Sequence, residues 1–188
     1  MLFRSGGETN LCHNAVDRHL ASRGDQTALV YISTEVNQER RFTYRELHAE
    51  VQRVAAMMQA LGVQKGDRVI VYMPMIPEAC FTILACARIG AVHSVVFGGF
   101  AANSLAARID DAKPKLMVSA DGGMRGGKSV LYKSLVDESI RLAKFPPEKV
   151  VIFNRGLDPK MPRTPERDLD YMELRAKHMG AQIGRAHV

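Results

Sequence analysis

Four short apolar runs recur between residues 67 and 153, and they constrain the fold more than any other feature of the sequence. The runs are VIVYM, AVHSVVF, KLMVSA and KVVIF, and longer segments with apolar residues at three- and four-residue spacing separate them. Short runs rich in β-branched residues predict strands, whereas the longer periodic segments predict helices. Strands that alternate with helices predict an α/β fold with a doubly wound, mostly parallel sheet flanked by helices. A nearly uninterrupted apolar run such as AVHSVVF is typical of a parallel strand that is covered on both faces.

Two of the expected helices carry explicit boundary signals. Thr43 and Glu46 form the T-x-x-E pattern of a capping box, which predicts a helix that begins there and ends at Gly62. Pro77 suits the first turn of a second helix, which we expect to end at Gly90. These signals fix the two helices independently of their apolar spacing.

The remaining elements are expected nearer the two ends of the chain. The spacing of apolar residues predicts a helix over 10–22, and TALVYIS followed by RRFTY predicts a β-hairpin. At the other end, 154–169 is rich in Pro, Arg and Asp, which predicts a surface loop. A short helix is expected from about 170 to 178.

Composition and charge exclude several classes of function. The net charge is +6, but no run of five like charges occurs, so we expect no nucleic-acid partner. Three cysteines with no C-x-x-C pair argue against a disulfide framework or a zinc knuckle, and they favour a reducing cytoplasm. Polar residues interrupt the most apolar stretch, 74–107, so we expect no membrane-spanning helix and no membrane partner.

Both ends of the chain read as foreign to the rest. The last six residues, IGRAHV (183–188), match a translated sequencing adapter, and the first five, MLFRS (1–5), match its reverse complement. We expect the natural sequence to be 6–182, cut from a longer reading frame, and such additions are excluded from reasoning about the fold.

The stretch DGGMRGGKSV contains a nucleotide-binding pattern. Gly122 to Ser129 fit G-x-x-x-x-G-K-[ST], the Walker A loop of P-loop NTPases. Context disfavours that interpretation, because at least two α/β units precede the loop and the next strand ends in Asn154 rather than in an aspartate. The alternative is a glycine-rich connection with two exposed cations, Arg125 and Lys128. Its glycines and cations suit a phosphate, though not necessarily that of ATP.

Longer segments resemble a known family. The run from YMPMIPEA through ACARIGAVHSVVFGGF to MRGGKSV is similar to the N-terminal domain of the short-chain acyl-CoA synthetases of the adenylate-forming superfamily. The segment NLCHNAVDRHLASRGDQTALVYISTEVNQERRFTYRELH resembles the propionate-activating branch more than the acetate-activating one. The resemblance covers essentially all of 10–182 and implies an incomplete N-terminal domain of such an enzyme.

The resemblance implies a reaction in two steps. A short-chain carboxylate attacks the α-phosphate of ATP to give an acyl-adenylate and pyrophosphate, and the thiol of coenzyme A then displaces AMP. The segment matching RGGK implies coenzyme A contacts by Arg125, Gly126, Gly127 and Lys128. At position 128 some relatives carry Arg, and Lys keeps the charge but loses the bidentate fork.

The segment matching FGGF implies that Phe97, Gly98 and Gly99 lie beside the adenine of coenzyme A, with Val130 nearby. From the residues alone, core packing at the end of a buried strand would explain Phe97, and a simple turn would explain the two glycines. The ATP and Mg²⁺ sites, the acyl pocket and the catalytic residues are implied to lie outside these 188 residues, so we expect the chain alone to be inactive.

Three functions remain open at this point. They are a piece of an acyl-CoA synthetase for propionate or acetate, a non-catalytic coenzyme A- or nucleotide-binding module, and a P-loop NTPase. The sequence leaves the oligomeric state open.

Overall fold

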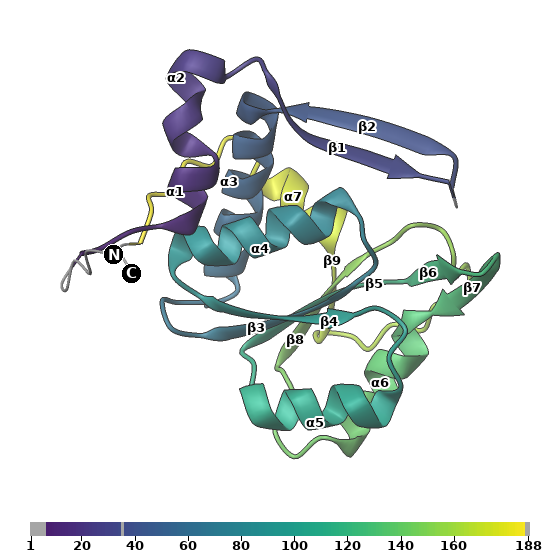
Figure 1. The fold of residues 1–188 in the computed structure, drawn as a ribbon. Helices are drawn as coiled ribbons and strands as arrows, with labels where there is room; N and C mark the ends of the chain where they lie inside the picture. Colours follow the sequence, from purple (N-terminus) through teal and green to yellow (C-terminus); the bar gives the residue numbers. More distant parts are fainter. Residues whose placement is uncertain (1–6, 35, 187–188) are drawn as a thin grey trace, which may run out of the picture.

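A five-stranded sheet in which every strand runs parallel forms the centre of the protein (Figure 1). The computed structural model describes residues 7–34 and 36–186, so residues 1–5 of the ends predicted to be foreign, and 187–188, lie outside it. The strand order is β4-β3-β5-β8-β9. The strands are β3 (Arg68–Met73), β4 (Val92–Phe97), β5 (Leu116–Ala120), β8 (Lys149–Phe153) and β9 (Asp168–Asp170).

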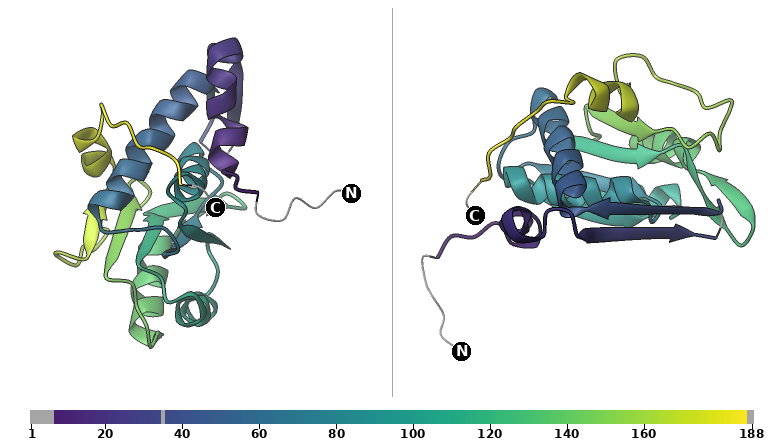
Figure 2. Two further views of the ribbon diagram at one scale, coloured as in Figure 1. Left: turned by 90° about the vertical axis from the view of Figure 1, so that its left-hand side faces the viewer. Right: turned by 90° about the horizontal axis from the view of Figure 1, so that it is seen from above.

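Helices cover both faces of this sheet, which confirms the predicted fold class (Figures 1 and 2). One face carries α4 (Pro77–Ile89), α3 (Tyr44–Ala60) packed on α4, and α7 (Tyr171–Lys177). The other face carries α5 (Ala102–Ala112) and α6 (Tyr132–Leu142). The chain from β3 to β4 moves to one side, and the chain from β4 to β5 crosses β3 to the other side, so the order reverses between β3 and β5.

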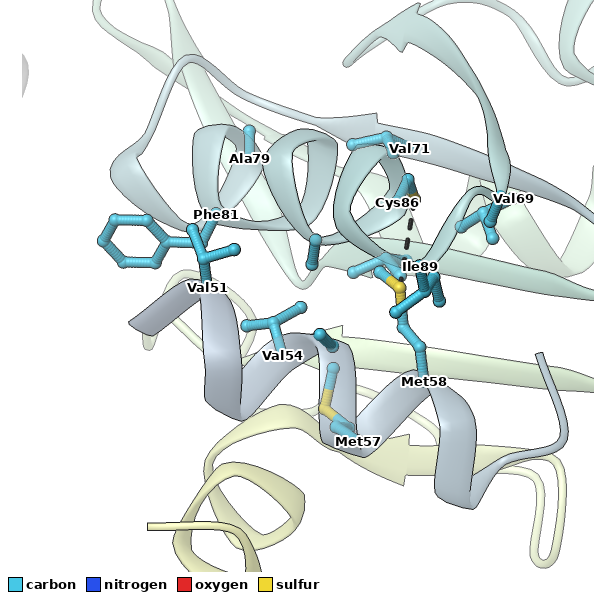
Figure 3. Close-up of a cluster of buried hydrophobic side chains, with 14 of the residues drawn as sticks. Val51, Val54, Met57, Met58, Val69, Val71, Ala79, Phe81, Cys86 and Ile89 are labelled. Carbon is cyan, nitrogen blue, oxygen red and sulfur yellow. Dashed lines mark hydrogen bonds between the residues drawn. The ribbon is translucent and has the colours of Figure 1, made fainter. Parts of the chain in front are cut away.

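Each face of the sheet buries its own apolar cluster. Side chains alternate along a strand, so Val69 and Val71 of β3 pack toward α3 and α4, whereas Ile70 and Tyr72 pack toward α5 and α6. Figure 3 shows the first cluster, where the Cys86 thiol of α4 lies 3.9 Å from the Met58 sulfur of α3.

The predicted helix boundaries are confirmed. The Thr43 side chain accepts from the Glu46 amide at 3.2 Å, and the Glu46 carboxylate accepts from the Thr43 amide at 2.8 Å, which completes the capping box of α3. Pro77 begins α4, and Gly90 ends it with the left-handed backbone that glycine tolerates.

Three expectations about the fold are wrong. The helix predicted over 10–22 is broken into α1 (Leu11–Ala15), a 3-10 turn (Asp17–His19) and α2 (Leu20–Arg23), because Val16 leaves the helical conformation. Within the predicted loop 154–169, residues 168–169 begin β9. The unbroken apolar run of β4 forms an edge strand, and its Val92, Val95 and Phe97 side chains are exposed rather than covered.

Strand β9 combines one apolar contact with a cluster of charges, since Leu169 packs against the first apolar cluster while Asp168 is held by ion pairs. The buried Lys133 ammonium of α6 lies 3.0 Å from Asp168 and also bonds Asp137, and Arg167 bonds the same two carboxylates. Burial opposes ionisation of Asp168, but hydrogen bonds from Arg167, the Thr164 amide and Lys133 outweigh it and lower the pKa of this carboxyl.

The predicted N-terminal hairpin is also present. Strands β1 (Thr27–Ser33) and β2 (Gln38–Thr43) pair antiparallel as a separate two-stranded sheet that extends over one end of the central sheet (Figure 1). Across the described residues, no helix is both long and apolar enough to cross a bilayer.

Candidate functional site

The glycine-rich segment forms a β-hairpin directly after β5. Its strands are β6 (Gly122–Arg125) and β7 (Lys128–Leu131), which pair antiparallel and project beyond the end of the sheet (Figure 1). Gly126 and Gly127 make the two-residue turn with φ values of 56° and 75°. Two successive positive φ values are the requirement of a type I′ turn, which glycine meets without strain.

This hairpin corrects both local interpretations of the segment. A P-loop wraps a phosphate at the start of a helix, but here Lys128 and Ser129 lie in a strand, and α6 begins only at Tyr132. Nor is the segment a simple connection between strand and helix. The amides that a Walker A loop turns toward phosphate are partly used in the ladder between β6 and β7.

Two cations face each other at the tip of the hairpin. Arg125 and Lys128 are cross-strand partners, so their side chains project from the same face. Both are exposed, and among the described residues no carboxylate forms an ion pair with either of them. Like charges directly opposite one another are destabilising, so this arrangement favours an anion bound between or beside them.

A pocket of about 280 Å³ lies at the base of the hairpin, beyond the carboxyl ends of β3 and β4. It is near the small end of the range for ligand sites, which begins at roughly 300 Å³. In open α/β sheets ligands bind beyond the carboxyl ends of the strands, where the strand order reverses. The pocket therefore occupies the position at which this kind of fold binds small molecules.

The pocket brings together half of the residues predicted to form the site. Its lining includes Phe97, Gly98, Arg125 and Val130. Gly126, Gly127 and Lys128 do not line it, because they form the exposed tip of the hairpin, and Gly99 also lies outside it.

The side chain of Phe97 is 53% exposed, so the core-packing interpretation of this residue is wrong. The exposed ring offers a flat apolar face to a ligand. The two glycines after it have different reasons to be glycine. Gly99 has a φ of 91°, which suits a turn, and its amide donates to the Tyr72 hydroxyl at 2.9 Å. A Cβ on Gly98 would lie 2.4 Å from the Tyr132 hydroxyl oxygen, so Gly98 makes room for that ring.

Tyr132 lines the pocket, and Tyr72 packs against its ring. The Tyr72 and Tyr132 rings are 5.2 Å apart, and the Tyr72 hydroxyl donates to the Phe100 carbonyl at 3.0 Å. Burial raises the pKa of Tyr72 to about 12, so this hydroxyl stays protonated at neutral pH and keeps the Gly99 turn in place.

Several residues of the pocket were missed by sequence reasoning. Tyr31 and Ser33 come from the end of β1, Pro74 and Met75 from the loop after β3, and Arg155 from the loop after β8. The position of Arg155 directly after a predicted parallel strand was the one available signal, because all such strands end at the same edge.

The charges around the pocket have one sign. Among the described lining residues, the ionisable groups that carry charge are Arg125 and Arg155, and none is Asp or Glu. No group of three or more His, Cys, Asp and Glu side chains within the described residues could hold a metal ion. The site is therefore suited to an anionic ligand with a flat apolar part rather than to a cation.

Comparison with known proteins identifies the family of the chain. The AMP-binding enzyme family matches residues 16–172. Propionate–CoA ligase from Escherichia coli is 58% identical over 94% of this chain, and acetyl-coenzyme A synthetase from Methylorubrum extorquens is 49% identical over 89%. The chain spans 28% and 26% of those two proteins, respectively.

A solved structure supports the same assignment. Acetoacetyl-CoA synthetase from Streptomyces lividans matches the whole chain with a TM-score of 0.85 and 30% identity, and the match covers 28% of that protein. The sequence and the fold thus point to one family. The chain belongs to the AMP-binding enzymes.

Proposed function

We propose that this chain carries part of the coenzyme A site of an AMP-forming short-chain acyl-CoA synthetase. The observation that carries the proposal is the 58% identity with propionate–CoA ligase over 94% of the chain. Propionate is therefore the proposed acid, and acetate is the alternative, since acetyl-coenzyme A synthetase is 49% identical. The proposed place of the reaction is the cytoplasm.

The proposed reaction has two steps. A carboxylate oxygen attacks the α-phosphorus of ATP, and pyrophosphate leaves to give the acyl-adenylate. The sulfur of coenzyme A, having lost its proton, then attacks the acyl carbonyl carbon, and AMP leaves to give the thioester. The proposed sites of ATP and Mg²⁺ lie outside the 188 residues, so this chain contributes binding of coenzyme A rather than chemistry.

The proposed binding mode uses the predicted residues in three ways. The exposed Phe97 ring stacks on the adenine, as aromatic side chains do on nucleotide bases. Gly98 and Val130 line the pocket beside the adenine, and Gly99 makes the turn next to them. Arg125 and Lys128 supply positive charge to the phosphates, with Arg125 offering a fork and Lys128 a point charge.

The hairpin tip completes the proposed site from outside the pocket. Gly126 and Gly127 hold the two cations on opposite strands, and their lack of side chains leaves the tip open to a large ligand. A coenzyme A molecule is much larger than the pocket, so its phosphates are expected to extend along the hairpin.

The proposal is tested most directly in a complete enzyme. Residues 6–182 would replace the matching segment of the Escherichia coli propionate–CoA ligase, and the two half-reactions would be measured separately. Exchange of pyrophosphate into ATP reports adenylate formation, and a thiol assay reports thioester formation. Arg125→Ala is expected to raise the KM for coenzyme A by about tenfold or more while pyrophosphate exchange continues.

Arg18→Ala is the matched control, because Arg18 is an exposed arginine on the 3-10 turn, away from the pocket. It should leave both half-reactions unchanged. Equal loss of both half-reactions in the Arg125 variant would contradict a coenzyme A site. Magnesium-dependent ATP binding by the chain itself, abolished by Lys128→Ala, would instead favour a P-loop NTPase.

A further inference from the structure

We propose that Arg155 is a further phosphate-binding residue of this site and that Asp121 is the positioning residue that holds it in place. The inference rests on the proposed coenzyme A site and adds a cation inside the pocket to the two on the hairpin. The ligand chemistry is a phosphate ester or diphosphate attached to adenosine.

The place of Arg155 favours an anion partner. Its side chain lines the pocket with Arg125, and it is partly buried. Its Nη1 donates to the Gly122 carbonyl at 3.1 Å, which uses one of the five N–H donors of a guanidinium. Among the described residues, no carboxylate pairs with it. Arg155 also borders a second pocket that contains Glu78, but the Glu78 carboxylate pairs with Arg40 at 2.9 Å. Arg155 is thus a partly buried arginine without an acidic partner, which is arranged to meet an anion.

Asp121 fixes the segment that carries Arg155. Its fully buried carboxylate accepts hydrogen bonds from the backbone amides of Arg155 at 3.0 Å, Leu157 at 2.7 Å and Asp158 at 3.2 Å. Three amides around one carboxylate satisfy its charge without any cation. The loop after β8 is therefore tied to the end of β5.

Asp121 also ties this loop to the hairpin. Its carbonyl accepts from the Tyr132 amide at 2.9 Å, where β7 passes into α6, and Gly122 begins β6 directly after it. One buried residue thus sets the relative positions of the hairpin with Arg125 and the loop with Arg155. The two arginines reach one pocket because both of their segments are bonded to Asp121.

Lys128 differs from Arg155 in its exposure to solvent, so the two cations should differ in how their contributions to binding depend on salt. It is exposed at the tip of the hairpin and does not line the pocket. Its contribution should be a screened charge interaction that weakens with salt, whereas that of Arg155 should persist.

The test is calorimetric binding to the 188-residue chain with three probes. Coenzyme A carries both a diphosphate and a 3′-phosphate, ADP carries only the diphosphate, and adenosine 3′-monophosphate carries only the 3′-phosphate. Arg155→Ala is expected to weaken coenzyme A about tenfold or more, and Arg155→Lys should recover part of that loss. Arg18→Ala is the matched control, and circular dichroism verifies that each variant is folded.

The probes identify which phosphate Arg155 meets. If Arg155→Ala also weakens ADP binding tenfold, Arg155 binds the diphosphate of coenzyme A. If it also weakens binding of adenosine 3′-monophosphate tenfold, Arg155 binds the 3′-phosphate. Either result supports the inference. Unchanged binding of all three probes to Arg155→Ala, while Arg125→Ala weakens them, would overturn it and leave the proposed function standing. If Arg125→Ala and Arg155→Ala both leave the KM for coenzyme A unchanged in the chimeric propionate–CoA ligase, the proposed function itself fails.

The role of Asp121 is tested by coupling. Asp121→Asn should weaken coenzyme A binding in the wild-type background but have little further effect in the Arg155→Ala background, because Asp121 acts on binding through the Arg155 side chain. Equal losses in both backgrounds would mean a general structural role. Amide hydrogen exchange in the wild-type chain gives a second test, since Arg155 and Leu157 should be protected although they lie in a loop. Rapid exchange at both amides would refute the positioning role.

Discussion

Replacing Gly123 by alanine is expected to destabilise the protein through one contact. A Cβ at this position would lie 2.3 Å from the Tyr132 hydroxyl oxygen and 2.9 Å from the ring carbon that bears it, with the next atom, on Pro74, at 3.4 Å. Real Cβ atoms do not approach other heavy atoms so closely, so the ring must move. Inserting one methyl group into a packed site costs about 1–3 kcal/mol. The hydroxyl oxygen accounts for most of the overlap, so Tyr132→Phe should remove most of that cost.

Gly98 provides a matched comparison on the same ring. A Cβ there would lie 2.4 Å from the Tyr132 hydroxyl oxygen, but also 2.5 Å from each of two ring carbons. Removing the hydroxyl leaves those carbons in place, so Tyr132→Phe should not rescue Gly98→Ala. The expected coupling energy is therefore about 1 kcal/mol or more between Gly123→Ala and Tyr132→Phe, and close to zero between Gly98→Ala and Tyr132→Phe.

Urea denaturation of the wild type and the five variants measures both coupling energies. The cycle subtracts the cost of Tyr132→Phe itself, which is measured in the single variant. Because the Tyr132 ring lines the pocket, coenzyme A binding should be weaker in Gly98→Ala than in the wild type. In the Gly123→Ala/Tyr132→Phe double variant, coenzyme A binding should be stronger than in Gly123→Ala. The reasoning is refuted if the two glycines couple equally to the hydroxyl, or if Gly123→Ala is as stable as the wild type.

Other parts of the fold give four further predictions. Thr43→Ala removes the N-cap of α3 and should lower the free energy of unfolding by about 1 kcal/mol in urea. Hydrogen bonds from Thr43 lower the pKa of Glu46 below its ordinary 4.5, so the stabilisation from this carboxylate is present above pH 4.5 and is lost as the pH falls through the lowered pKa; the Glu46→Gln variant should show a flatter acid limb. Lys133→Met removes the buried ammonium but leaves Arg167 bonded to Asp168 and Asp137, so it should lower the free energy of unfolding by about 1.5–3 kcal/mol; an unchanged urea midpoint would contradict a stabilising role of Lys133. Burial raises the pKa of the Cys86 thiol to about 12, so a thiol reagent at pH 8 should label it only after unfolding, and rapid native labelling would contradict this.

The central sheet and its helices could be predicted because each carries a local signal. Buried strands β3, β5 and β8 are apolar at nearly every position, and the ends of α3 and α4 are marked by a capping box, a proline and a glycine. These signals act within a few residues, so they predict the same elements regardless of how distant parts of the chain pack.

Elements fixed by distant residues could not be predicted in the same way. Strand β9 has the sequence DLD, and its place beside β8 depends on Lys133, which lies 35 positions before Asp168. The apolar run of β4 contains no information about whether a further strand lies beside it. It therefore predicted a covered strand, whereas the structure places it at the edge.

The site also contains residues that local sequence could predict and residues that depend on distant contacts. The resemblance assigned Phe97 and Arg125 from their own neighbourhoods, and both line the pocket, although their role in binding stays a prediction. The residues next to Arg155 in the sequence form no recognisable motif. Arg155 reaches the pocket only because β8 pairs with β5 and the Asp121 carboxylate accepts from the Arg155 amide. A residue of this kind becomes visible once the strand order is known.

The match to the Walker A pattern predicts a P-loop wrongly for a physical reason. The pattern fixes only glycines, a lysine and a hydroxyl residue, and two adjacent glycines before a strand-forming segment serve a type I′ turn equally well. What decides between loop and hairpin is the segment after Lys128, where the β-branched Val130 favours a strand and the helix begins only at Tyr132. A helix starting at Lys128 would turn its first amides toward a phosphate, whereas here cross-strand pairing sets two cations side by side instead. The same letters thus favour an anion in both folds, by backbone amides in one and by side-chain charge in the other.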